Sequence, residues 1–149
     1  MTEYLETTVD KFIFKVAKDR LYTPEGLWAQ IENSLVRIGV TDFFQQHNGD
    51  IAFVTVQPAG TVLRLKDELA SVETIKVNMS LESPVSGKIV NLNKLVTSKP
   101  ETINLDPYGN GWLCDIEANR WDTERADLLS PEQYFHKMKN DAEEEVKKG

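Results

Sequence analysis

The sequence is poor in the residues that build disulfides and metal centres. It has one cysteine, Cys114, among 149 residues, which excludes an internal disulfide and a cysteine-rich zinc site. Its two histidines, His47 and His136, lie far apart and lack ligand-like spacing. We therefore expect no metal, and we expect Cys114 to be a small buried core residue. A redox role for this thiol is the less favoured alternative.

Motifs of nucleotide-binding and hydrolytic enzymes are also missing. The sequence contains no phosphate-binding loop, no GxGxxG or GxSxG pattern and no HExxH pattern. Without such a motif, or any metal-binding or nucleophilic cluster, we predict that the chain is not an enzyme. A carrier or binding protein that acts with separate enzymes is favoured.

Long apolar runs are absent too. No stretch of 18 apolar residues exists, and the opening MTEYLETTVDKF lacks the basic start and apolar middle of a secretory signal. The net charge is −7 and the sequence pI about 4.9, which disfavours binding to nucleic acid and to anionic membranes. We expect a cytoplasmic protein with neither of these partners. The length predicts one domain.

The two ends of the chain are predicted to be helical. In residues 1–20, an N-terminal extension, apolar groups recur at the spacing of one helix face: Leu5, Val9, Phe12, Ile13 and Val16. Alternation from Phe12 to Val16 would also suit a strand over part of this segment. In residues 130–149, Ser130 can cap a helix, Pro131 suits its first position, and Gln133 completes a capping box. A C-terminal helix with a charged tail is expected there.

Residues 21–129 are β-rich. A short helix is predicted from Thr41, as N-cap, to a stop at Asn48-Gly49, and residues 93–111 are predicted to be loop. Residues 69–81 contain no glycine, proline or Asn-Gly pair, so propensity favours one uninterrupted strand there. The other expected strands are 27–31, 35–40, 51–56, 62–65, 88–92 and 112–116.

Five segments, in this order along the chain, carry a family resemblance. They are GVTDF at 39–43, GDIAFV at 49–54, VETIKV at 72–77, SPVSGKIV at 83–90 and DPYGNGWL at 106–113. Together they resemble the H protein of the glycine cleavage system. The resemblance implies a mainly β fold over 21–129: a flattened β barrel-sandwich hybrid of the lipoyl-domain type, with short helices and a C-terminal helix.

The same resemblance implies a function for Lys76. This residue matches the lysine that carries lipoic acid, as lipoamide, at the tip of a hairpin. The chain should therefore reverse near 74–77, in a type I turn that needs no glycine, against the propensity for one strand. Such a swinging arm ends in a dithiolane that works by thiol–disulfide exchange. Gly87 in the neighbouring turn is predicted to need a positive φ.

Residues beside Lys76 have expected roles as well. Glu73 matches an acidic position that helps a lipoylating enzyme, such as lipoate ligase, to recognise the hairpin; an ordinary exposed carboxylate is the alternative. Ile75 and Val77 flank the lysine where biotin domains usually have methionine, so lipoyl is preferred over biotin. Dihydrolipoamide dehydrogenase is a further expected partner.

Departures from the family pattern affect the expected pathway. Gly26 and Leu27 replace a His-Glu pair before Trp28, and Val77 replaces a small residue. An aminomethyl cargo is cationic, so the loss of polar groups at these positions argues against it. The replacements favour instead a branch of H-like lipoate-binding proteins, which serves bacterial sulfur oxidation with a heterodisulfide-reductase-like complex. The alternative is an H protein that carries the aminomethyl group among the glycine cleavage enzymes. An unmodified interaction module is the alternative of another class.

Overall fold

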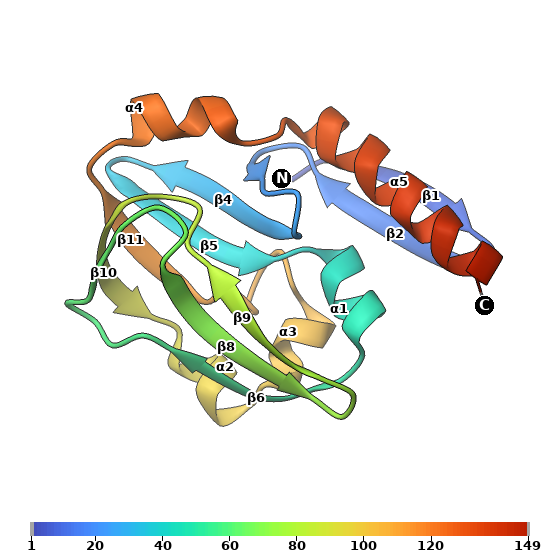
Figure 1. Cartoon of the computed structure of the whole chain (residues 1–149), viewed down its shortest axis with the longest axis horizontal. Coiled ribbons are helices and arrows are strands. Elements are labelled where there is room, and N and C mark those ends of the chain that lie inside the picture. The colour runs from blue at the N-terminus through green and yellow to red at the C-terminus, as the bar shows by residue number, and fades with distance from the viewer. Residues whose placement is uncertain (1, 149) are drawn as a thin grey trace.

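The computed structural model describes residues 2–148 and is mainly β, as predicted. Six strands form the largest sheet, which is open at both ends (Figure 1). Their order in it is β3 (Leu21–Tyr22), β4 (Leu27–Glu32), β5 (Leu35–Val40), β11 (Cys114–Ala118), β10 (Gly87–Leu92) and β7 (Val62–Leu63).

A second sheet of three antiparallel strands carries the predicted hairpin. Its order is β6 (Ile51–Val56), β8 (Glu68–Thr74) and β9 (Asn78–Glu82). The main core is shared by the two sheets: Val36, Ile38, Ile89 and Ile116 from the larger one pack in one cluster with Val54, Leu69, Val72 and Leu81 from the smaller. In β5, for example, the alternate residues Val36, Ile38 and Val40 enter this core, since strand side chains point to opposite faces in turn.

The N-terminal segment is a β-hairpin, so the helical prediction for residues 1–20 is wrong. Strands β1 (Tyr4–Val9) and β2 (Phe12–Ala17) pair in antiparallel register, with Val9 opposite Phe12. Asp10 makes the turn with a φ of +56°, a conformation that Asp tolerates better than most residues. The apolar residues fit both periods, and the β-branched and aromatic composition favours the strand.

The C-terminal helix is confirmed as α5 (Pro131–Lys148); residues 1 and 149 of the two predicted end segments lie outside the described residues. The backbone N–H of Ser130 donates to Gln133 Oε1 at 2.9 Å, and that of Gln133 donates to Ser130 Oγ at 3.1 Å. This is the predicted capping box. Tyr134 stacks on Tyr22 with centroids 4.7 Å apart, which fastens α5 to the rest of the molecule.

A second, smaller core lies between α5 and the N-terminal hairpin. It joins Val9, Phe14 and Val16 of the hairpin to Tyr134, Met138 and Ala142 of α5. Figure 1 shows α5 running alongside β1 and β2. The last turns of α5 and the turn between β8 and β9 lie toward the same side of the molecule (Figure 1). The end of α5 is therefore on the side that carries the predicted modification site.

The connections contain more helix than the sequence predicted. Helix α1 (Asp42–Asn48) has the predicted cap, since Thr41 Oγ accepts the Phe44 N–H at 3.1 Å. The predicted loop 93–111 holds α2 (Lys94–Ser98) and α3 (Glu101–Leu105). At one turn or so each, they are too short to show a helical period. Helix α4 (Trp121–Glu124) and a 3₁₀ turn (Arg125–Asp127) then lead toward α5.

Candidate functional site

Lys76 lies in the turn between β8 and β9, so the chain reverses where the resemblance predicted and the single strand over 69–81 is wrong. Glu73 pairs with Asn78 across the hairpin, and the Thr74 N–H donates to the Val77 carbonyl at 2.9 Å. Residues 74–77 thus close a tight turn with Ile75 and Lys76 at its tip.

A threonine side chain takes the place of glycine in stabilising this turn. Thr74 Oγ accepts the Lys76 N–H at 3.2 Å and the Val77 N–H at 3.1 Å. Short polar side chains stabilise turns in this way. Positive φ angles occur at three non-glycine residues of the described chain, and neither Ile75 nor Lys76 is among them. Negative φ at both central positions agrees with the predicted type I turn.

The tip presents its side chains to solvent. Ile75 is 89% exposed and Val77 43% exposed; Lys76 and Glu73 are exposed as well. Among residues 2–148, no ion pair or side-chain hydrogen bond engages the Lys76 amine. An unpaired amine on a fixed turn is open to acylation by a separate enzyme.

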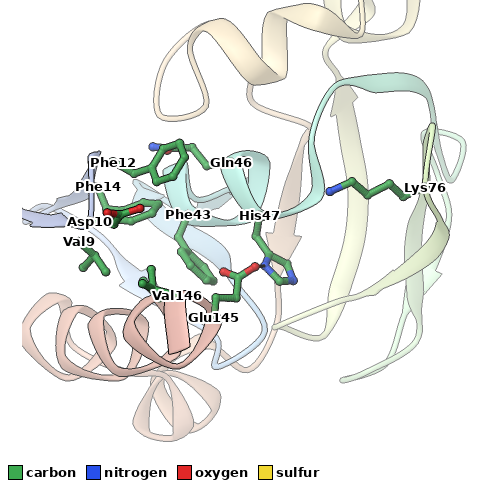
Figure 2. A pocket seen from close by; sticks show the side chains of 11 residues that line it. Val9, Asp10, Phe12, Phe14, Phe43, Gln46, His47, Lys76, Glu145 and Val146 are labelled. Atoms are coloured by element: carbon green, nitrogen blue, oxygen red, sulfur yellow. Dashed lines mark hydrogen bonds and ion pairs between the residues drawn. The ribbon is translucent and has the colours of Figure 1, made fainter. Parts of the chain in front are cut away.

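Two hollows lie beside the hairpin. The first has a volume of about 370 Å³ and includes Lys76 in its wall, as Figure 2 shows. Its other lining residues are Val9, Asp10, Phe12, Phe14, Phe43, Gln46, His47, Ala142, Glu145 and Val146. The second has a volume of about 550 Å³ and follows β9 away from the tip. It is lined by Glu25, Leu27, Phe43, Phe44, His47, Asn48, Met79, Ser80, Leu81 and Glu82.

Helix α1 separates the two hollows. Phe43 and His47 line both of them, and the His47 ring stacks on Phe43 with centroids 5.5 Å apart. His47 Nδ1 lies 2.6 Å from Glu145 Oε1, so α1 is tied to the last turns of α5. The predicted Thr41 cap located this helix, but no local signal marked the face that bears these two side chains.

Of the three residues that depart from the family pattern, Gly26, Leu27 and Val77, only Leu27 lines the second hollow. Leu27 is buried in its wall, while Gly26 has a φ of +100° beside Phe44. The second hollow still contains acidic groups, because Glu25 and Glu82 both line it. Of the described residues that line the two hollows, none belongs to the 106–113 motif. The Pro107 carbonyl of that motif instead accepts the indole N–H of Trp28 at 3.0 Å.

Cys114 is fully buried, which confirms the core role predicted for it. Burial, helped by the charge of Asp115, raises the pKa of its thiol to about 12. At pH 8 only about one thiol in 10,000 would then be ionised, and the thiolate is the reactive form. Cys114 is therefore poorly placed for exchange with a dithiolane.

Iodoacetamide should consequently label Cys114 at least about a hundredfold more slowly in the native protein than in urea at pH 8. Intact mass against time measures both rates. Fast labelling of the native protein would show that the thiol is accessible and reopen a redox role.

Within residues 2–148, no group of three metal-ligating side chains is found. No helix in the same part of the chain is long and apolar enough to cross a membrane.

Comparisons with known proteins agree with this architecture. Residues 20–141 match the family model for the glycine cleavage H-protein. A glycine cleavage system H protein of Carboxydothermus hydrogenoformans is 37% identical over 128 residues, which cover 86% of this chain and 98% of the relative. A probable glycine cleavage system H protein of Natronomonas pharaonis is 40% identical over 121 residues, which cover 81% of this chain and 94% of the relative.

A solved structure supports the same assignment. The crystal structure of a glycine cleavage system H protein from Mycobacterium marinum matches with a TM-score of 0.73 at 31% identity. The match covers 80% of this chain and 95% of that one. The resemblance expected from the sequence motifs is confirmed, and this chain belongs to the glycine cleavage H-protein family.

Proposed function

We propose that this protein is a carrier that bears a lipoyl group on Lys76 and passes a bound intermediate between separate enzymes. The observation that carries the proposal is the unpaired Lys76 amine at the tip of a tight hairpin. Thr74 fixes the backbone of the tip, so the lysine is always offered from the same position. An unmodified interaction module would have no need of this arrangement.

The surroundings of Lys76 fit a lipoyl group. Acylation of the amine removes its charge, which lets the side chain lie against the apolar walls beside it, such as Phe12 and Val146. When bound, lipoate supplies a dithiolane that opens by thiol–disulfide exchange. Tethering it here raises its local concentration at a docked enzyme to about the millimolar range. Glu73, exposed on β8, is the proposed recognition point for a lipoylating enzyme, such as lipoate ligase.

Glycine cleavage is the pathway we propose, in place of the sulfur oxidation favoured by the sequence motifs alone. The relative from Carboxydothermus hydrogenoformans is a glycine cleavage system H protein, and the relative from Natronomonas pharaonis is a probable glycine cleavage system H protein. The second hollow retains the carboxylates of Glu25 and Glu82, which suit a cationic aminomethyl cargo. These acids offset the replacement of an acid by Leu27, one of the three departures, with Gly26 and Val77, on which the sulfur hypothesis depended. The partners are then the glycine cleavage enzymes, including dihydrolipoamide dehydrogenase.

Sulfur oxidation with a heterodisulfide-reductase-like complex is kept as a second candidate on one observation. Leu27 presents an apolar side chain to the second hollow where the family pattern has an acid. A neutral sulfur-bearing cargo would tolerate that wall.

Reconstitution decides between the two pathways. The lipoylated protein, mixed with glycine decarboxylase, should support exchange of the glycine carboxyl with labelled bicarbonate as an authentic H protein does. Replacing both Glu25 and Glu82 by glutamine should lower the exchange rate by about three- to tenfold, as expected for a partly exposed charge interaction of about 1 kcal/mol. Glu117→Gln, an exposed carboxylate on β11, is the matched control and should change nothing.

Absence of exchange by the lipoylated wild-type protein would contradict glycine cleavage. Reduction of the same preparation by a heterodisulfide-reductase-like complex would then establish the second candidate.

A further inference from the structure

Three strongly exposed apolar side chains lie around the hairpin tip. Ile75 is 89% exposed within the tip, Leu105 is 81% exposed at the end of α3, and Phe53 is 65% exposed on β6. Among the large apolar side chains of residues 2–148, only Val62 is comparably exposed, at 70%. Single exposed apolar residues are common on protein surfaces, but a group of them at one place indicates a surface that binds another protein.

Strand pairing brings Phe53 close to the tip. β6 lies beside β8, with Ile51 opposite Thr74 and Phe53 opposite Glu73 (Figure 1). Residues that pair directly across antiparallel strands have Cα atoms about 4.5–5.5 Å apart. Phe53 and Glu73 are both exposed, so the aromatic ring and the carboxylate lie on the solvent side of the sheet, next to the turn that carries Lys76.

A β-bulge turns Phe53 outward. Ile51 and Val54 are buried, whereas Ala52 and Phe53 between them are both exposed. The pairing register with β8 shifts between Ile51 and Phe53, and the extra residue at such a bulge redirects the side chains that follow it. Strict alternation from Ile51 would have placed Phe53 in the core. The bulge therefore exposes an aromatic side chain on the face that carries Glu73.

Leu105 comes to the same end of β6 from helix α3. The side chain of its neighbour Asn104 accepts the Ile51 N–H at 3.0 Å and donates to the Gly49 carbonyl at 3.0 Å. These bonds fix the end of α3 against the start of β6, which is the end of that strand nearest the tip. Ile103 of the same helix is buried in the main core. Helix α3 is thus anchored without Leu105, whose side chain is left to solvent.

We propose that Phe53, Ile75 and Leu105 form a docking surface for the enzyme that attaches the lipoyl group. The inference rests on the proposed lipoylation of Lys76. It extends the recognition of the chain beyond Glu73 to residues of β6 and α3 that are distant from the lysine in the sequence.

The position of the surface favours this enzyme over the others. The enzyme that forms the amide must bring the Lys76 amine itself into its active site, so it has to contact residues around the tip. Enzymes that act later meet the far end of the lipoyl arm and need not contact them. Apolar side chains around the Glu73 carboxylate suit a partner with an apolar surface and a basic group beside its active site.

Steady-state kinetics of lipoylation test the proposal. The full-length wild type and the double variant Phe53→Thr with Leu105→Gln are each varied in concentration with lipoate ligase, at saturating lipoate and ATP. The double variant should raise the KM for the protein about tenfold, as expected for the loss of two apolar contacts at an interface. The kcat should be unchanged, because the Lys76 amine and its turn remain as they are.

Two controls separate docking from folding. Threonine suits a strand and glutamine a helix, and both replaced side chains are exposed, so the melting temperature of the double variant should match the wild type. Val62→Thr is the matched control. Val62 is exposed on β7 and precedes β8, whereas the tip follows β8, so this variant should keep the wild-type KM.

A second measurement asks whether a later enzyme uses this surface instead. Long incubation with excess ligase should lipoylate the double variant completely, and the product should then support exchange with glycine decarboxylase at the wild-type rate. Loss of that exchange, with an unchanged KM for lipoylation, would assign the surface to a later enzyme and overturn the proposal.

The outcomes separate this inference from the proposed function. A wild-type chain that gains no lipoyl group refutes the lipoylation of Lys76, and the docking surface with it. A wild-type chain that is lipoylated, together with a double variant whose KM stays at the wild-type value, refutes the docking surface alone.

Discussion

Replacing Lys76 by arginine is expected to abolish lipoylation completely. The guanidinium of arginine stays protonated at any pH the protein experiences, so it offers no free amine for the amide bond. The fold should be unaffected, because the Lys76 side chain is exposed and only its backbone N–H takes part in the hydrogen bonds that hold the turn. Intact mass after incubation with lipoate ligase, lipoate and ATP measures the effect.

A second lysine provides the control for this loss. Lys88 is exposed on β10, so Lys88→Arg should still gain one lipoyl group at the wild-type rate. The melting temperatures of both variants should match the wild type. A lipoyl group on Lys76→Arg would show that another lysine is the target and would remove the basis of the carrier assignment.

Replacing Gly87 by alanine is expected to lower the stability of the fold strongly. Gly87 pairs with Ala118 on one side and with Leu63 on the other. A methyl group there would overlap the Glu117 carbonyl oxygen and lie 2.9 Å from the Ala118 Cα. Backbone atoms cannot move aside as a flexible side chain can, so β10 would have to part from β11.

Overpacking of this kind costs about 3 kcal/mol or more, which for a chain of this length lowers the melting temperature by roughly 6–12 °C. Gly60→Ala is the matched control, since Gly60 has a φ of +94° and a methyl group added to it would meet nothing within 4 Å. This variant should cost only about 1 kcal/mol, for the left-handed backbone. Thermal unfolding measures both variants. If Gly87→Ala lowered the melting temperature no more than Gly60→Ala does, β10 and β11 would be packed less closely than in the structure.

Gly87 also shows what the sequence could and could not reveal. A positive φ was predicted there, and the φ of +156° is positive but close to the extended region. The stronger reason for glycine is the neighbouring backbone, which belongs to residues 117 and 118 and is invisible in the local sequence. Contacts between distant segments leave no local signal.

Two helices that begin with a side-chain N-cap, α1 and α5, were predicted correctly. Thr41 at the start of α1 and the Ser130–Gln133 capping box of α5 use side chains to satisfy helix N–H groups. Such signals depend on a few neighbouring residues. The N-terminal hairpin lacked one, because its apolar residues fit both a helix and a strand, and packing against α5 accompanies the strand form.

The candidate site was found in part. Propensity placed Lys76 inside a continuous strand, because the turn is held by Thr74 rather than by glycine or proline; only the family motifs indicated the reversal. The residues that line the two hollows could not be predicted. The first joins residues 9–14, 43–47 and 142–146 to the hairpin tip, and only the folded chain brings these segments together.

The most direct test of the proposed function is a peptide map of the wild-type protein after incubation with lipoate ligase, lipoate and ATP, beside an authentic H protein. We predict a gain of one lipoyl group, located on the peptide that contains Lys76. An unmodified chain under conditions that fully lipoylate the authentic H protein, or a lipoyl group on any other lysine, would contradict the assignment of Lys76 as the carrier residue.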